Sequence, residues 1–134
     1  MVKYIKRSLA MLLALALMLS VVPVSFAAED SYSTDGAYIF TFSDSGITVN
    51  QEGTGGKYSA KNTELKIQAA GTYIVSGSCA DGFIQVSKSV TGVTLVLNGL
   101  TLTNSVTCPL SLNKSTGVTL VIADGTTNTL TDNA

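Results

Sequence analysis

"GVTLVLNGLTLTNS" (residues 92–105) decides the fold, because it returns in altered form as "GVTLVIADGTTNTLTDN" (117–133). Both copies are rich in Val, Leu, Ile and Thr, with polar and apolar residues alternating, which is typical of β-strands. The glycines that open the two copies, Gly92 and Gly117, are 25 positions apart. Self-similarity at such a spacing is the sequence pattern of a stacked repeat.

The segments around this stretch also recur, each with a partner 26 to 28 positions later. In a parallel β-helix every strand stacks on its equivalent one coil later, about 4.8 Å away, so similar residues lie on similar residues. A β-sandwich also has regularly spaced short strands but does not require this similarity. We therefore expect an all-β parallel β-helix, or solenoid, with three short strands and about 25–28 residues per coil. The aligned pairs are 83–89 with 109–115 (offset 26), 73–78 with 100–105 (offset 27) and 101–104 with 129–132 (offset 28).

The repeats divide the chain. Residues 28–36 are polar and are predicted to be a flexible leader, and 37–64 are predicted to hold two strands around the turn "SDSG" and a Gly-rich loop. The coils are expected at 65–91, 92–116 and 117–134, the last lacking its third strand. A solenoid needs a cap over its last coil, so we expect a fold that is incomplete at the C-terminus and able to self-associate through the open end.

Residues 1–27 have the pattern of a secretory signal peptide. Three basic residues precede a long apolar run, and the small residues Ser25 and Ala27 stand where cleavage would occur. An uncleaved membrane anchor is the alternative. We expect cleavage, a secreted or cell-surface protein, and no stable membrane span afterwards.

The charge balance argues against nucleic acid as a partner. The chain has 8 Lys and Arg against 9 Asp and Glu, and three of the basic residues lie in the predicted signal peptide. The remainder is mildly acidic, whereas phosphate binding requires a basic surface. The chain also has no His, which removes the commonest general base, and no Trp to stack on a neutral sugar.

Two lysines are candidate ligand-binding residues. The alignment of 83–89 with 109–115 places Lys88 and Lys114 in equivalent turns, about one strand spacing apart. Two adjacent ammonium groups would attract a polyanion with regularly spaced carboxylates. The alternative is two solvated turn lysines that point apart.

Three further polar residues, Asn98, Asp124 and Asp132, are candidates for ligand or calcium binding. Asn98-Gly99 and Asp124-Gly125 occupy similar places in the repeat, so oxygen ligands could gather along one edge. Calcium needs six to eight oxygen ligands, which isolated turn residues do not supply alone. The alternative is that these side chains stabilise their own turns by hydrogen bonds to the backbone.

Cys79 and Cys108 are the only cysteines. Export would permit a disulfide between them, and the repeat places them in neighbouring turns. Two small buried thiols are the alternative.

Several segments resemble the N-terminal coils of a bacterial secreted carbohydrate-binding family, from about Ala37 to the end of the chain. They are "FTFSDSGITV" (40–49), "AGTYIVSGSCADGFIQV" (70–86), "VTLVLNGLTLTNS" (93–105) and "VTLVIADGTTNTLTD" (118–132). The resemblance implies a right-handed parallel β-helix similar to pectate-lyase-type solenoids. It also implies binding of acidic plant polysaccharide, or pectin, with polygalacturonate as the expected ligand. Bound calcium is implied too, with most of its ligands outside this chain.

The function expected from the sequence is therefore non-catalytic binding of an acidic polysaccharide. Lys88 and Lys114 are the only candidate lyase bases, and nothing around them in the sequence would lower a lysine pKa as such a base requires. Two alternatives stay open: a structural or adhesive cell-surface solenoid, and the N-terminal part of a polysaccharide lyase.

Overall fold

The computed structural model describes residues 32–133, so the predicted signal peptide lies outside the described residues. All ten regular elements in this part are β-strands, as the sequence predicts, and none of these residues forms a helix. Accordingly, no helix within 32–133 is long and apolar enough to cross a membrane.

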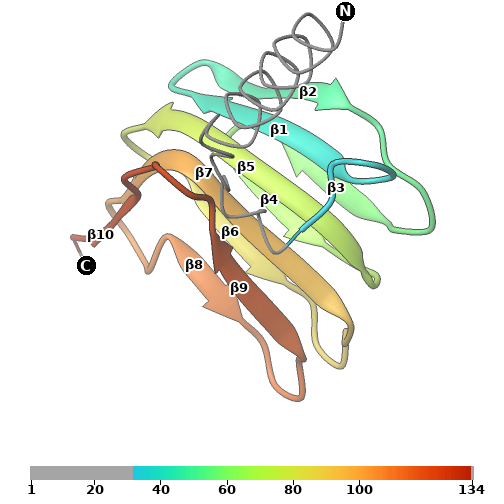
Figure 1. Cartoon of the computed structure of the whole chain (residues 1–134). Coiled ribbons are helices and arrows are strands. Elements are labelled where there is room, and N and C mark those ends of the chain that lie inside the picture. The colour runs from blue at the N-terminus through green and yellow to red at the C-terminus, as the bar shows by residue number, and fades with distance from the viewer. Residues whose placement is uncertain (1–31, 134) are drawn as a thin grey trace, which may run out of the picture.

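The strands form two mixed sheets that lie face to face (Figure 1). Sheet A contains β1 (Tyr38–Ser43), β2 (Gly46–Gln51), β5 (Gly71–Cys79), β7 (Val93–Asn104), β9 (Val118–Ile122) and β10 (Thr129–Asp132). Sheet B contains β3 (Tyr58–Lys61), β4 (Glu64–Ile67), β6 (Phe83–Val86) and β8 (Leu110–Leu112).

The chain alternates between the sheets, and its parallel strands are in register. From β5 to β8 a strand of sheet A is followed by one of sheet B: β5 by β6, and β7 by β8. The last two strands, β9 and β10, both belong to sheet A. Strand β5 pairs with β7 in sheet A, while β6 pairs with β8 in sheet B. We call the strands at one height in the stack a level. The four levels are β1 with β4, β5 with β6, β7 with β8, and β9 with β10.

The register confirms three of the four predicted offsets. Val93 pairs with Val118, Ile84 with Leu110, and Thr101 with Thr129. The predicted alignment of 73–78 with 100–105 is wrong, because Tyr73 pairs with Leu95 and Cys79 with Leu102. Strand β5 pairs with both halves of β7, at offsets of 22 to 23 residues, which are shorter than the 27 that the sequence predicts.

Two local predictions also need correction. Residues 93–98 and 100–104 form one strand, β7, rather than two, with a bend where Gly99 has a φ of 78°. The segment predicted to be a Gly-rich loop contains β3, which pairs antiparallel with β4. The hairpin of β1 and β2 around "SDSG" is confirmed.

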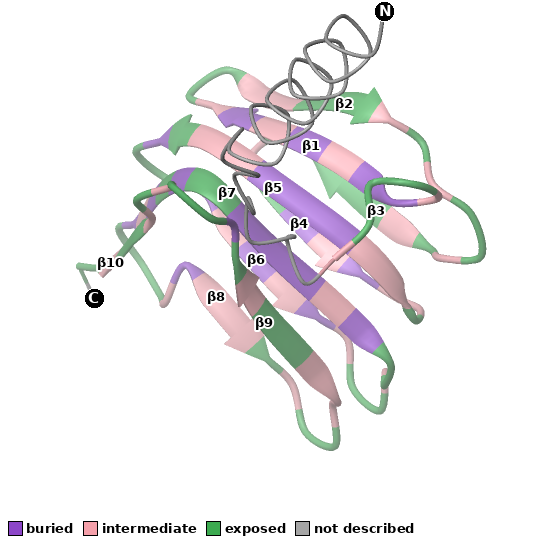
Figure 2. Ribbon diagram, viewed as in Figure 1, coloured by how far each residue is buried: buried purple, intermediate pink, exposed green. Residues whose placement is uncertain are grey.

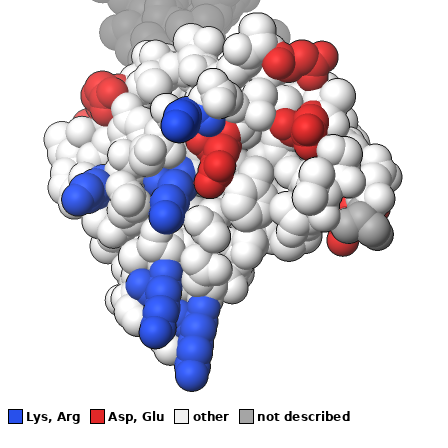
Figure 3. Space-filling view, turned by 180° about the vertical axis from the view of Figure 1, so that it is seen from behind, with Lys and Arg blue, Asp and Glu red and all other residues white. Residues whose placement is uncertain are grey.

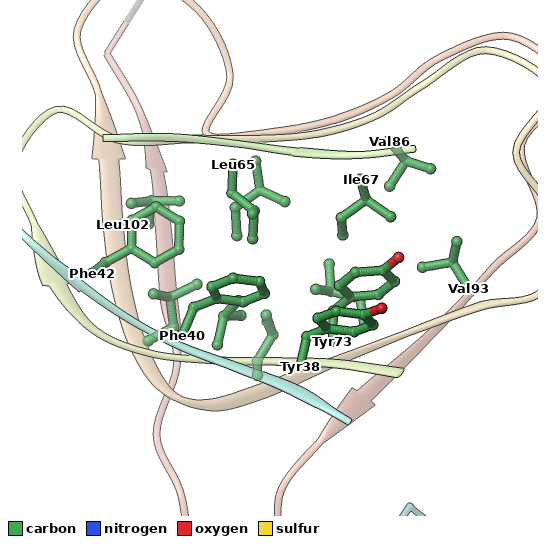
Figure 4. Packing of buried hydrophobic residues seen from close by; sticks show 14 of the residues in the cluster. Tyr38, Phe40, Phe42, Leu65, Ile67, Tyr73, Val86, Val93 and Leu102 are labelled. Carbon is green, nitrogen blue, oxygen red and sulfur yellow. The ribbon is translucent and has the colours of Figure 1, made fainter. Parts of the chain in front are cut away.

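The core lies between the sheets. Along several strands, buried residues alternate with more exposed ones (Figure 2). Leu65, Ile84, Leu95 and Leu102 are fully buried. Aromatic rings fill the part of the core under β1 (Figure 4). The rings of Tyr38 and Tyr73 stack there, with centroids 5.0 Å apart and planes at 13°.

Buried tyrosine hydroxyls hold the Gly-rich segment before β3 against this core. The Tyr38 hydroxyl oxygen accepts a hydrogen bond from the Gly56 N–H at 2.9 Å. The Tyr73 hydroxyl accepts one from the Lys57 N–H at 3.1 Å and donates to the Ala69 carbonyl oxygen at 2.8 Å. Burial raises the pKa of Tyr73, because the charged phenolate would lose its hydration there.

Candidate functional site

The outer face of sheet B carries polar side chains in rows that cross the strands. In β4 the side chains of Leu65 and Ile67 are buried in the core, so Lys66 between them points outward. The register places Lys66 beside Gln85 of β6, and Gln85 beside Ser111 of β8. A ligand on this face would therefore meet a cation, an amide and a hydroxyl on three adjacent strands.

A second row lies where these strands end. The Gln68 N–H donates to the Lys57 carbonyl oxygen at 2.8 Å, the Ser87 N–H to Ile67 at 2.9 Å and the Asn113 N–H to Val86 at 3.2 Å. These bonds align Lys57, Gln68, Ser87 and Asn113 across the sheet. Lys57 is exposed and Gln68 and Asn113 are half-buried, so they can add two amides and a second cation to the same face. The Oγ of Ser87, by contrast, is buried and has no hydrogen-bond partner among the described residues.

Lys88 and Lys114 follow this row, in two turns that stack as the sequence predicts. Both side chains are exposed. The residues after them, Ser89 and Ser115, have nearly equal positive φ angles of 66° and 64°. The Ser89 N–H donates to the Lys114 carbonyl oxygen at 3.1 Å, so the two turns are in direct contact. Whether the two ammonium groups bind a ligand stays a prediction.

All lysines of the described part lie in sheet B, beside its strands or in the turns after them, and sheet A contains none within 32–133. Seen from this side, the lysine side chains gather on one face of the molecule (Figure 3). We call this surface the basic face. Its single carboxylate within the described strands, Glu64, pairs in register with Lys61. The lysines are Lys57, Lys61, Lys66, Lys88 and Lys114.

The outer face of sheet A has a different character. Ile39, Ile74, Val96 and Val121 form a continuous row across four strands. Ile74 and Val96 are buried, packed in a small apolar cluster with Ala37 and Ala123. A charged ligand would find no cation on this side within the described strands.

The structure does not bring the other predicted site residues to the basic face. Asn98 is exposed in β7, and Asp132 pairs in register with Asn104, both in sheet A. The register offset grows from 25 at Ile122 to 28 at Thr129, so Asp124 lies in a loop longer than its counterpart in β7. Asp124-Gly125 is thus not a strict equivalent of Asn98-Gly99.

No group of three or more Asp, Glu, Cys or His side chains within 32–133 is placed to hold a metal ion. Asp81 has a structural contact instead: its Oδ1 accepts hydrogen bonds from the Ser105 N–H at 3.2 Å and hydroxyl at 3.1 Å. The carboxylate links the turn of one level to that of the next.

The two cysteines are free thiols in the structure. Cys79 is buried in the core at 2% exposure, and Cys108 is partly exposed. This arrangement agrees with the alternative of two free thiols rather than a disulfide, although only Cys79 is fully buried.

Tyr38 and Tyr58 of the N-terminal region take part in core packing. Tyr38 is only 5% exposed, and Tyr58 packs edge-on against Tyr38 and Phe40. The Tyr58 hydroxyl donates to Glu52 Oε1 at 2.5 Å. This hydrogen bond, with smaller contributions from burial and the Glu52 charge, raises the pKa of Tyr58 to about 12.

A polar depression that the sequence did not indicate lies beside β2. It has a volume of about 650 Å³ and is lined by Thr34, Asp35, Gly36, Gln51, Glu52 and Thr54. Both Nε2 hydrogen bonds of Gln51 are made to backbone carbonyl oxygens, those of Thr34 and Ala37. No pattern in the sequence brings residues 34–36 and 51–54 together, because their contact depends on the β1–β2 hairpin.

Comparison with known proteins bears on the basic face and on the depression beside β2. The sequence profile of a family described as "Carbohydrate-binding domain-containing protein" matches residues 61–134, more than half of the chain. The chain belongs to this family. A protein of the same description from Acetivibrio thermocellus is 35% identical over 86 residues, which is 63% of this chain and 29% of the relative. No solved structure matches the chain.

The family match covers four of the five lysines of the basic face and none of the residues that line the depression. Lys61, Lys66, Lys88 and Lys114 lie within 61–134, whereas residues 34–54 lie before it. Most of the basic face thus lies within the segment that defines the family. The basic face is therefore the candidate site.

Proposed function

We propose that this chain is a secreted, non-catalytic carbohydrate-binding protein that holds an acidic polysaccharide, such as polygalacturonate, on the basic face. The observation that carries the proposal is the gathering of all five lysines of the described part on sheet B and its turns. The signal-peptide pattern of residues 1–27 supports secretion.

The arrangement suits a linear polymer of uronic acids. Lysine ammonium groups pair with carboxylates as point charges, while Gln68, Gln85 and Asn113 offer amides to sugar hydroxyls. Both rows run across the strands, so a chain lying along them would pass from one strand to the next about every 4.8 Å and meet a different polar group, an ammonium, amide or hydroxyl, on successive strands.

We also propose that the stacked levels are the first coils of a right-handed parallel β-helix. The support is the in-register parallel pairing of β5, β7 and β9 in one sheet and of β4, β6 and β8 in the other. The chain passes from one sheet to the other between these strands, as a solenoid requires.

Calcium enters the proposal only as a condition to test. Within 32–133 no three Asp, Glu, Cys or His side chains gather at one place, so calcium, which takes six to eight oxygens, would need further ligands such as backbone carbonyl oxygens or residues outside this chain. Asp124 and Asp132 stay candidates for single contacts, and binding measured with and without a chelator decides whether the ion contributes.

Affinity for polygalacturonate, measured against a neutral glucan and over a range of salt concentrations, tests the function. We expect preference for the acidic polymer, weakening with salt. Replacing Lys88 and Lys114 by Ala together should weaken binding roughly fivefold to tenfold, as expected for two partly screened charges. Thr101→Ala, on sheet A, is the matched control and should leave affinity unchanged.

The same assay separates the alternatives. Unchanged affinity in the double lysine variant would contradict the role of the basic face. Shortening of the polymer during the assay would favour a polysaccharide lyase, and absence of binding to either polymer would favour the structural or adhesive solenoid.

A further inference from the structure

Two serines beside the stacked lysines of the basic face have a backbone conformation that is rare for serine. Ser89 and Ser115 have φ angles of 66° and 64°, and within 32–133 the only other non-glycine residue with a positive φ is Asn62. Residues with a side chain seldom adopt this left-handed region, because the Cβ atom crowds the backbone, and asparagine tolerates it better than serine. Both turns therefore hold a serine where glycine would be less strained.

The conformation belongs to a tight turn. The Val90 N–H donates to the Ser87 carbonyl oxygen at 3.2 Å and closes a four-residue turn. Lys88 and Ser89 are the two central residues of this turn. A positive φ at the third residue of such a turn favours glycine or asparagine. The next level repeats the same conformation at Ser115, so the strained serine occurs twice on the basic face.

Folding does not use the hydroxyls of these two serines. Both residues are exposed, and no hydrogen bond joins either hydroxyl to another residue of 32–133. The turns are joined through the backbone instead, where the Ser89 N–H donates to the Lys114 carbonyl oxygen at 3.1 Å. The hydroxyls of Ser89 and Ser115 are therefore available to a ligand.

Each serine places a hydroxyl beside an ammonium group. Lys88 and Ser89 are adjacent in one exposed turn, and Lys114 and Ser115 repeat the pair in the next. An ammonium group pairs with any anion as a point charge, whereas a hydroxyl both donates and accepts hydrogen bonds and so can recognise another hydroxyl. A uronic acid carries a carboxylate and hydroxyls on one ring, so it offers a partner to both groups at once.

We propose that the hydroxyls of Ser89 and Ser115 bind sugar hydroxyls of the acidic polysaccharide whose carboxylates the adjacent lysines hold. This inference rests on the proposed function and adds the means by which the basic face distinguishes an acidic polysaccharide from other polyanions. A polymer with carboxylates but no hydroxyls, such as poly-glutamate, would use the lysines alone.

Binding of these two polymers to the full chain at low salt tests the proposal. Ser89→Ala combined with Ser115→Ala should weaken binding of polygalacturonate about threefold to tenfold, because two exposed hydrogen bonds are lost. Binding of poly-glutamate should not change. The double lysine variant should weaken binding of both polymers. Ser78→Ala, at an exposed serine of sheet A, is the matched control and should change neither.

Glycine variants separate the effect of the hydroxyl from that of the backbone. Replacing both serines by glycine should weaken polygalacturonate binding as alanine does. The glycine variant should nevertheless unfold at a higher temperature than the alanine variant, since glycine adopts a positive φ without steric cost. Equal unfolding temperatures would contradict the strain from which the proposal is drawn and would overturn it.

The binding outcomes also separate this inference from the proposed function. Unchanged polygalacturonate affinity in the alanine variant, or an equal loss for both polymers, would overturn the role of the serines and leave the lysine site intact. Failure of the unmodified chain to bind polygalacturonate would overturn the proposed function, and this inference with it.

Discussion

Asn104 donates a hydrogen bond through Nδ2 to the carbonyl oxygen of Gly82 at 2.9 Å, from a side chain only 7% exposed. Its Oδ1 accepts from the N–H groups of Val106 at 2.9 Å and Thr107 at 2.7 Å. One amide therefore ties the turn after β5 to the loop after β7. Asp132 occupies the equivalent position one level later, where it pairs in register with Asn104.

Asn104→Ala should lower the free energy of unfolding by about 1–3 kcal/mol, because it leaves buried backbone groups without partners. Urea denaturation followed by circular dichroism measures the change. Asn50→Ala, at an exposed position with one hydrogen bond to Thr41, is the control and should cost less than about 0.5 kcal/mol. Equal effects at the two positions would show that the bonds of Asn104 are not structurally important.

Gly56→Ala should destabilise the protein by about 1–3 kcal/mol through overpacking. A Cβ at this position would lie 2.5 Å from a ring carbon of Tyr38 and 2.6 Å from the Tyr73 hydroxyl. Gly117→Ala is the comparison, since its nearest neighbour, Thr91, would be 3.3 Å away. Thermal unfolding of both variants decides, and a smaller loss for Gly56→Ala than for Gly117→Ala would contradict the packing described.

Tyr58 should titrate late, at a pKa of about 12, because its hydroxyl donates to Glu52. Folding raises this pKa above the unfolded value of about 10, so the folded state favours the protonated phenol. The resulting stability is fully present below pH about 10 and is lost as the pH rises through about 12.

Ultraviolet titration of Glu52→Gln tests this assignment, because removal of the carboxylate should lower the pKa of Tyr58 toward its ordinary value. Glu64→Gln keeps the Glu52 contact and serves as the control. A titration curve identical in Glu52→Gln and the unmodified protein would rule out Glu52 as the cause.

The two thiols should differ in reactivity. Cys108 is partly exposed and should react with iodoacetamide in the folded protein, whereas Cys79, at 2% exposure, should react only after unfolding. Mass spectrometry of labelled peptides measures both rates. Comparable rates would contradict the burial of Cys79, and failure of both to react without prior reduction would show that a disulfide forms in solution.

The sequence predicts strands well because their residues alternate. In β4 and β6 the buried positions are those that a period of two assigns to the core, and repeated motifs identify the partners of β9 and β10. In β7 the alternation changes phase at the bend, and Val96 is buried on the other face. The alignment fails at β5, where pairing depends on the lengths of the connections rather than on residue likeness. Likewise, Asn98-Gly99 is typical of a turn, but β7 pairs with β5 both before and after Gly99, so the chain forms one bent strand there.

The candidate site was only partly predictable. Lys88 and Lys114 are found because their turns repeat in sequence. Lys57 and Lys66 join them only through the antiparallel pairing of β3 with β4 and the parallel pairing of β4 with β6. The segments that carry these two lysines have no recognisable repeat, so their place on the basic face requires the tertiary structure.

Each strand pairs only with strands of its own or of an adjacent level. This pairing determines the order in which the chain can fold. Every contact between paired strands forms with a segment already synthesised or with the next one, and the aromatic cluster lies in the earliest levels. We expect an N-terminal nucleus on which later strands are added in the order of their emergence, as in other linear repeat architectures. An exported chain could then begin to fold on the far side of the membrane before its last residues have crossed.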